Sequence, residues 1–161
     1  MTTREYNQCV DEYSDGVFRF VLKNLRDEEM ARDVVQEAFM KMWEKAATIT
    51  GTKAKSYLYT AAYHTMIDMI RKEKRYTSGE NISPEKFSTS AQYSDLKDVL
   101  DEAFETLNEI QKSVLLLRDY EGYSYNDIAE ITGLSDAQVK VYIYRARIAM
   151  KKYIGSMEMV I

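Results

Sequence analysis

The sequence predicts an all-α protein made of two small helical domains joined by a linker. Apolar residues recur at steps of three and four along most of the chain, which is the period of an α-helix. The 161 residues include only 6 glycines and 1 proline, fewer than strands joined by tight turns usually need. Helix-capping residues precede successive apolar segments, and 45% hydrophobic residues are enough for a packed core.

The first half reads as three helices. Residues 4–25 carry apolar side chains at helical spacing. Asp27 is a suitable N-cap for a second helix that runs to about Ala47, with two glutamates in its first turn, where the helix dipole favours carboxylates. A loop around Gly51 precedes a third helix, which runs to about Arg75.

Composition changes after the third helix. Residues 76–95 contain five serines, Gly79 and Pro84, and show no helical period, so we interpret them as a flexible linker. This interpretation gives a first domain over residues 1–75 and a second over residues 96–154. Fully extended, the linker spans at most roughly 65–70 Å at about 3.3–3.6 Å per residue.

The second half reads as four helices with defined ends. A first helix covers residues 95–107, and stop signals stand at Gly122 and Gly133. The other three helices each begin with a capping residue and a partner three residues later: Asn108 with Gln111, Ser124 with Asp127, and Ser135 with Gln138.

The last helix has two different faces. At 100° per residue, one side is apolar and faces the core: Val139, Ile143, Ala146, Met150 and Tyr153. The other side is basic with apolar members: Lys140, Val141, Tyr144, Arg145, Ile148, Lys151 and Lys152, with Arg147 at the flank. Together with the short preceding helix, this is the pattern of a helix-turn-helix with the second helix as reader. The alternative is an ordinary solvated face, but Val141 and Ile148 favour contact with a thymine methyl or a partner protein.

A stripe on the third helix also suits nucleic acid. It consists of Thr60, His64, Asp68, Arg71 and Arg75. Tyrosines at positions 57, 59 and 63 lie between these residues, and aromatic and basic side chains together favour unstacked bases and phosphates. For each tyrosine taken alone, a half-buried core position is the preferred interpretation. The stripe as a whole favours melted DNA.

The second helix mixes acidic and apolar residues. Asp33, Gln36 and Glu37 lie among Phe39, Met40, Met42 and Trp43. This mixture favours a partner protein over DNA, although a plain amphipathic helix has the same pattern.

Composition argues against several other functions. The single Cys9 rules out a disulfide framework and a zinc cluster, and a lone histidine and the absence of a phosphate loop argue against an enzyme. No apolar run resembles a secretion signal or the roughly 20 residues of a membrane span. We expect a soluble, cytoplasmic protein with no cofactor, no metal and no membrane insertion. With a net charge of −4, the chain should need a partner to bind DNA.

The ordered set of segments resembles the bacterial sigma factors of the extracytoplasmic-function group. The resemblance covers about residues 10–76 and 96–154, through "DEEMARDVVQEAFMKMW", "SYLYTAAYHTMIDMIRK" and the segment from "LNEIQKSVLLL" to "ARIAMKKY". It implies a subunit that binds RNA polymerase core through the β′ clamp helices and the β flap. Such a subunit recognises the −10 and −35 promoter elements and directs transcription initiation. It also implies an anti-sigma factor that clamps both domains.

The resemblance assigns roles to three sets of residues. Core polymerase binding falls on Asp33, Gln36, Glu37, Met40 and Trp43. Recognition and melting of the −10 element fall on Thr50, Lys53, Tyr57, Thr60, His64, Arg71 and Arg75. Recognition of the −35 element falls on Lys140, Val141, Tyr144, Arg145, Arg147 and Lys151.

Two rival functions stay open at this point. One is an autonomous helix-turn-helix regulator, which predicts tight duplex binding without polymerase and a steep salt dependence. The other is a protein-interaction module whose helix-turn-helix no longer meets DNA, suggested by the apolar residues Val141, Tyr142 and Ile148.

Overall fold

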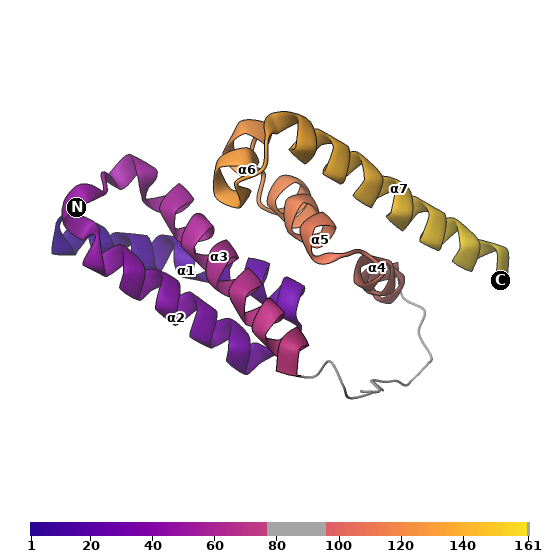
Figure 1. Cartoon of the computed structure of the whole chain (residues 1–161), viewed down its shortest axis with the longest axis horizontal. Helices are drawn as coiled ribbons and strands as arrows, with labels where there is room; N and C mark the ends of the chain where they lie inside the picture. The colour runs from indigo at the N-terminus through magenta and orange to yellow at the C-terminus, as the bar shows by residue number, and fades with distance from the viewer. Residues whose placement is uncertain (77–95, 161) are drawn as a thin grey trace.

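The described part of the chain is helical and forms two groups of helices (Figure 1). The structure is a computed structural model that describes residues 1–76 and 96–160, with backbone alone for residues 76 and 157–160. The first group is α1 (Thr3–Leu25), α2 (Glu28–Glu44) and α3 (Ala54–Tyr76). The second group is α4 (Leu96–Glu105), α5 (Glu109–Leu115), α6 (Tyr125–Thr132) and α7 (Asp136–Val160). The predicted linker, except for the residue that ends α3, lies outside the described residues.

Local side-chain bonds set the start of the first two helices. Thr2 and Glu5 form a capping box on α1, in which each side chain bonds the other residue's backbone N–H, at 3.1 and 2.8 Å. Arg26 adopts a left-handed conformation (φ 59°) that ends α1, and the Asp27 side chain accepts from the Met30 N–H at 3.0 Å. The predicted cap at Asp27 is confirmed.

The segment between α2 and α3 consists of two short 3-10 turns, Ala46–Thr48 and Gly51–Lys53. The helix predicted to reach Ala47 therefore ends at Glu44 and tightens into a turn. Ile49, between the turns, is buried and joins the core, while Thr50 and Lys53 are exposed. The loop is thus anchored by one apolar side chain and presents its polar residues to solvent.

All three predicted caps of the second half are present. Asn108 and Gln111 form a capping box with bonds of 2.8 and 3.1 Å. The Asp127 N–H bonds the Ser124 hydroxyl at 3.1 Å. Ser135 and Gln138 exchange bonds of 3.1 and 2.9 Å. The two predicted stops, Gly122 and Gly133, have φ values of 78° and 81°, which glycine adopts at little cost because it lacks a Cβ.

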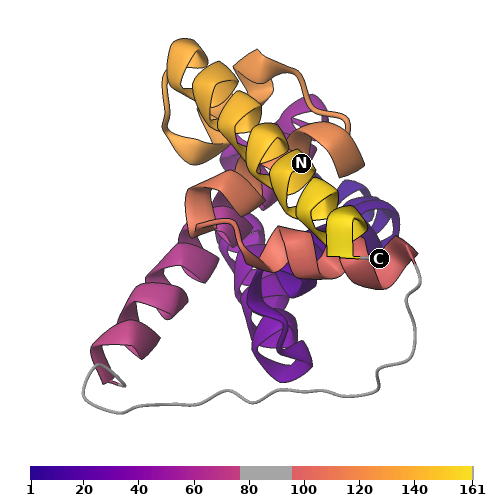
Figure 2. The ribbon, with the colours of Figure 1, turned by 90° about the vertical axis from the view of Figure 1, so that its right-hand side faces the viewer.

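Two features of the second half differ from the sequence prediction. The helix expected from Asn108 to Gly122 is α over its first part and then widens into a π-turn, Leu116–Tyr120. The last helix continues to Val160 rather than ending near Tyr153, and α4 lies against it (Figure 2). The Tyr153 hydroxyl donates to Glu102 of α4 at 3.0 Å, so α7 is held against α4 at the point where the prediction ended the helix.

The two groups of helices pack against each other. α1 contacts α5, and α3 contacts α6. A buried hydrogen bond of 3.2 Å joins Ser113 of α5 to Asn24 of α1, and the rings of Tyr59 and Tyr123 meet edge to face. One continuous cluster of buried apolar residues therefore runs through both groups.

Candidate nucleic-acid and partner interfaces

The outer face of α2 carries the residues predicted to meet a partner protein. Asp33, Gln36, Glu37, Met40 and Trp43 are all exposed. The opposite face, with Val34, Ala38 and Met42, is buried. Met40 is 61% exposed and Trp43 52%, which is unusual for large apolar side chains. The five residues follow the helical repeat, so together they form one surface, the α2 face.

Trp43 is held in place by a residue from α1. The rings of Tyr6 and Trp43 meet edge to face with centroids 4.9 Å apart, and the Tyr6 hydroxyl donates to the Phe39 carbonyl at 3.0 Å. A shallow cavity of about 460 Å³ opens here, lined by Thr3, Tyr6, Asn7, Met40, Trp43 and Glu44. The α2 face therefore offers a fixed aromatic ring beside a hollow, an arrangement typical of protein interfaces.

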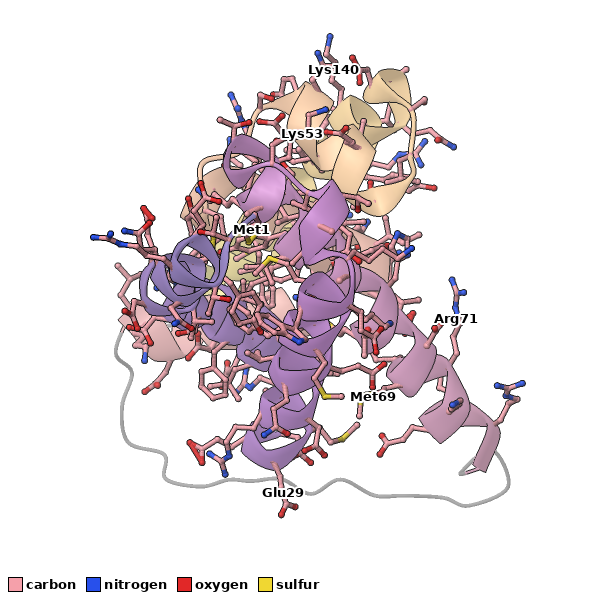
Figure 3. The ribbon with its side chains drawn as sticks, turned by 90° about the vertical axis from the view of Figure 1, so that its left-hand side faces the viewer. Met1, Glu29, Lys53, Met69, Arg71 and Lys140 are labelled. Carbon is pink, nitrogen blue, oxygen red and sulfur yellow. The ribbon has the colours of Figure 1, made fainter. Side chains whose placement is uncertain are left out.

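The residues predicted to meet the −10 element form an exposed track along the start and outer stripe of α3. Thr50, Lys53, His64, Arg71 and Arg75 are exposed, and Tyr57 and Thr60 are half-buried. Figure 3 shows Lys53 near one end of this track and Arg71 towards the other.

Two of the α3 tyrosines are not available to DNA. Tyr59 is 2% exposed and Tyr63 7%, so the interpretation of these side chains as core residues is confirmed. Tyr57 differs, because its hydroxyl reaches the Lys41 carbonyl at 3.4 Å while part of the side chain stays open. Of the three tyrosines, only Tyr57 can stack on a base without unpacking the core.

The face of α7 that is predicted to read DNA has the expected composition. On the predicted core side, Val139, Ile143 and Ala146 are buried, whereas Met150 and Tyr153 are half-buried. Lys140, Val141, Tyr144, Arg145, Ile148, Lys151 and Lys152 are exposed. Tyr144 is 66% exposed and Val141 43%, so apolar and basic groups alternate on an open helix surface. Such a surface can contact base methyls and phosphates together.

Arg147 is held differently from its neighbours on α7. Its guanidinium donates to both carboxylate oxygens of Asp119, at 2.6 and 3.3 Å. The hydrogen bond that Arg147 donates to Asp119 raises the pKa of Arg147 above its ordinary value. Asp119 lies in the π-turn, so this pair ties α7 to the segment after α5. Arg145 and Arg147 are both exposed, but Arg147 is engaged by Asp119.

A cluster between the two groups of helices was missed by sequence reasoning. Glu121 accepts hydrogen bonds from Arg19 and Tyr59, and the Tyr123 ring packs beside them. Burial, followed by the bond to Glu121, raises the pKa of Tyr59 far above the tyrosine norm. The available signal was Gly16, a glycine inside a helix, which often marks a close approach.

Neither a metal centre nor a membrane helix is found in the described ranges. Within residues 1–76 and 96–160, no group of histidine, cysteine or acidic side chains could hold a metal ion. Over the same residues, no helix combines the length and apolar character that crossing a bilayer requires.

Comparison with known families identifies both halves of the chain. Residues 9–76 match the family model described as Sigma-70 region 2, and residues 97–150 match Sigma-70, region 4. Together these matches cover most of the chain, in the order that the sequence motifs predicted.

Individual relatives agree with this assignment. The chain is 28% identical over 150 residues to RNA polymerase sigma factor YlaC of Bacillus subtilis (strain 168), covering 88% of this chain and 87% of that protein. It is 27% identical over 144 residues to ECF RNA polymerase sigma factor SigM of the same strain, covering 86% and 88%. The structure resembles the sigma factor RpoE from Bartonella quintana, solved with the anti-sigma factor NepR, with a TM-score of 0.79, 25% identity, and coverage of 95% of this chain and 98% of that one. The chain therefore belongs to the extracytoplasmic-function sigma factors, the promoter-recognition subunits of bacterial RNA polymerase.

Proposed function

We propose that this chain binds RNA polymerase core through the α2 face and the second group of helices, and reads the promoter with α3 and α7. The observation that carries the proposal is the exposure of three chemically distinct surfaces on one chain. These are an apolar and acidic face on α2, a polar and basic track on α3, and a basic and apolar face on α7. We place the chain in the cytoplasm, with no catalytic activity of its own.

Residues 1–75 would form the unit that binds the β′ clamp helices and the −10 element. Trp43 and Met40 supply the apolar contact area, and the carboxylates beside them select a basic partner surface. On the same unit, Thr50 and Lys53 border the position at which a base leaves the duplex, and Tyr57 offers a ring on which it can stack. Arg71 and Arg75 supply charge for the phosphates.

Residues 96–154 would form the unit that binds the β flap and the −35 element. Lys140, Val141, Tyr144 and Arg145 face the major groove in this proposal. The arginine is the side chain best suited to a bidentate contact with guanine. The linker, residues 76–95, would allow the two units to reach separate elements.

A groove on the second group suits an apolar segment such as the flap. Its volume is about 910 Å³. The apolar lining from this group includes Leu100, Phe104, Leu116, Met150 and Ile154. Residues of α1 close one side of the groove, namely Leu22, Lys23 and Arg26. An anti-sigma factor is the second proposed partner, because the similar sigma factor RpoE was solved with one bound.

Reconstitution with core polymerase tests this function. The chain should co-elute with core enzyme on a sizing column and produce a discrete run-off transcript from its own upstream region. Trp43→Ala should weaken co-elution, whereas Arg145→Ala should leave co-elution intact and reduce the transcript. Tight binding to duplex DNA alone, with no association with core, would instead support the autonomous regulator.

A further inference from the structure

A buried carboxylate joins the two groups of helices. The Glu121 side chain is 6% exposed and lies just after the π-turn of the second group. Its Oε1 accepts from the Tyr59 hydroxyl at 2.8 Å and from Arg19 Nη2 at 3.1 Å, and its Oε2 accepts from Arg19 Nε at 3.1 Å. Both donors belong to the first group. A buried charge with three hydrogen bonds needs its partners, because an unpaired buried charge is strongly unfavourable.

A glycine makes this contact possible. A Cβ at Gly16 would lie 2.7 Å from the Tyr59 hydroxyl oxygen and 3.4 Å from Glu121 Oε1. A separation of 2.7 Å is too short for a carbon beside that oxygen, so a side chain at position 16 would displace the hydroxyl. The helix itself would accept alanine, which favours helix more than glycine does.

Further contacts surround the carboxylate. The Tyr123 ring lies 5.2 Å from the Tyr59 ring, and the Lys55 ammonium lies 4.8 Å from the Tyr123 centroid. At the far side of the interface, Lys74 at the end of α3 approaches Glu109 at the start of α5, with 3.4 Å between Nζ and Oε2. The interface therefore extends along α3 and holds the two groups in one defined arrangement.

This arrangement brings the two proposed DNA-reading surfaces close together. Lys55, near the start of α3, contacts Tyr123, while Lys140, near the start of α7, lies 5.7 Å from the ring of Tyr125. Only one residue separates the two tyrosines, and Figure 3 shows Lys53 and Lys140 at the same end of the molecule. Elements at −10 and −35 lie about two turns of B-DNA apart, or roughly 70 Å at about 34–36 Å per turn. The packed arrangement cannot read both elements at once.

We propose that Glu121, with Arg19 and Tyr59, forms an intramolecular latch that keeps the free chain in a closed state unable to read a promoter. Opening of the latch separates the two groups and precedes promoter recognition. The inhibitory effect of closure rests on the proposed function, because closure can block promoter recognition only if both surfaces read DNA. The closed state also places α1 against the groove on the second group, so the same opening would uncover that groove on one side.

Zero-length crosslinking of the free, full-length chain tests the latch. A water-soluble carbodiimide joins an amine and a carboxylate in contact, and Lys74 with Glu109 is such a pair across the interface. The pair Lys41 and Glu37, 3.4 Å apart within α2, provides an internal standard. Mass spectrometry should find the 74–109 crosslink in the wild-type chain. Gly16→Ala and Glu121→Gln should lower its yield relative to the 37–41 crosslink by roughly tenfold, which corresponds to about 1.4 kcal/mol.

Matched controls separate opening from unfolding. Tyr123→Phe keeps all three hydrogen bonds to Glu121 and should keep the 74–109 crosslink at the wild-type level. Gly16→Ala should retain the helical circular dichroism of the wild type, since its local effect on α1 favours helix. If Gly16→Ala loses helicity, the 74–109 crosslink yield of Glu121→Gln alone decides whether the latch exists. Absence of the crosslink from the wild type, or an unchanged yield in Glu121→Gln, would overturn the latch.

A transcription arm distinguishes this inference from the proposed function. When the sigma chain is mixed with core enzyme at limiting sigma concentration, the Gly16→Ala and Glu121→Gln variants should form active holoenzyme several-fold faster than the wild type. Equal rates in all variants, together with lower crosslink yields, would refute the inhibitory role of the closed state. No transcript from any variant would contradict the proposed function, while the crosslinking result on closure would stand without polymerase or DNA.

Discussion

The rings of Tyr59 and Tyr123 meet edge to face across the two groups of helices, with centroids 5.2 Å apart and planes at 69°. Their hydroxyls have opposite surroundings. The Tyr59 hydroxyl donates to Glu121 at 2.8 Å, whereas the buried Tyr123 hydroxyl has no hydrogen-bond partner among the described residues. Removal of the hydroxyl oxygen should therefore change the free energy of unfolding differently at these two neighbouring tyrosines.

Replacement of each tyrosine by phenylalanine should give opposite results. Tyr59→Phe should lower the free energy of unfolding by about 1–3 kcal/mol, because the buried carboxylate loses a donor. Tyr123→Phe should be neutral or stabilising by up to about 1 kcal/mol, because it removes a buried polar group that bonds nothing. Urea unfolding followed by circular dichroism measures both, and equal losses would contradict the different roles of the two hydroxyls.

Alkaline pH should destabilise the chain through the same two residues. Burial is the main cause that raises the pKa of both tyrosines above the ordinary value of 10.0. Their contribution to stability is therefore complete below about pH 10, and it is lost above that pH because the unfolded chain releases these protons first. Melting temperatures of the wild type should fall more steeply between pH 9 and 11 than those of a chain with both tyrosines changed to phenylalanine. Parallel curves would refute this.

The α2 face should be the main determinant of affinity for core enzyme. Trp43→Ala should weaken binding by about 2–4 kcal/mol, as expected for an anchored aromatic residue in an interface. Arg32→Ala provides a control on the same helix, since Arg32 is exposed and pairs only weakly with Glu28, at 3.7 Å. Competition with a labelled sigma factor for core measures both affinities. A loss in Arg32→Ala as large as that in Trp43→Ala would argue against a localised contact.

Arg145 and Arg147 should differ in their effect on −35 recognition. Arg145→Ala should cost about 1–3 kcal/mol at one promoter position and relax the preference there. Arg147 is engaged by Asp119, so Arg147→Ala should mainly remove a half-exposed ion pair and change stability by about 0.2–1 kcal/mol. Holoenzyme binding to templates mutated at each −35 position separates the two. A position-specific loss in Arg147→Ala would assign base contact to that residue.

Features set by neighbouring residues could be predicted from the sequence. The caps at Asn108, Ser124 and Ser135 depend on a partner three residues away, and the faces of α7 depend on the helical repeat. Contacts between distant residues could not be predicted in this way. Glu121 and Tyr59 lie 62 positions apart, and Arg147 and Asp119 lie 28 apart, with no repeat linking them. The π-turn that contains Asp119 and the continuation of α7 past Tyr153 carry no cap signal in the sequence.

Gly16 has a genetic consequence. Codons for glycine and alanine differ at one base, so a single point mutation can introduce the methyl group that the close approach to Tyr59 excludes. If the closed state restrains the subunit, mutants selected for signal-independent expression of its regulon should recur at positions 16, 19, 59 and 121, in both halves of the gene. Gain-of-function alleles that avoid these codons would locate the restraint elsewhere.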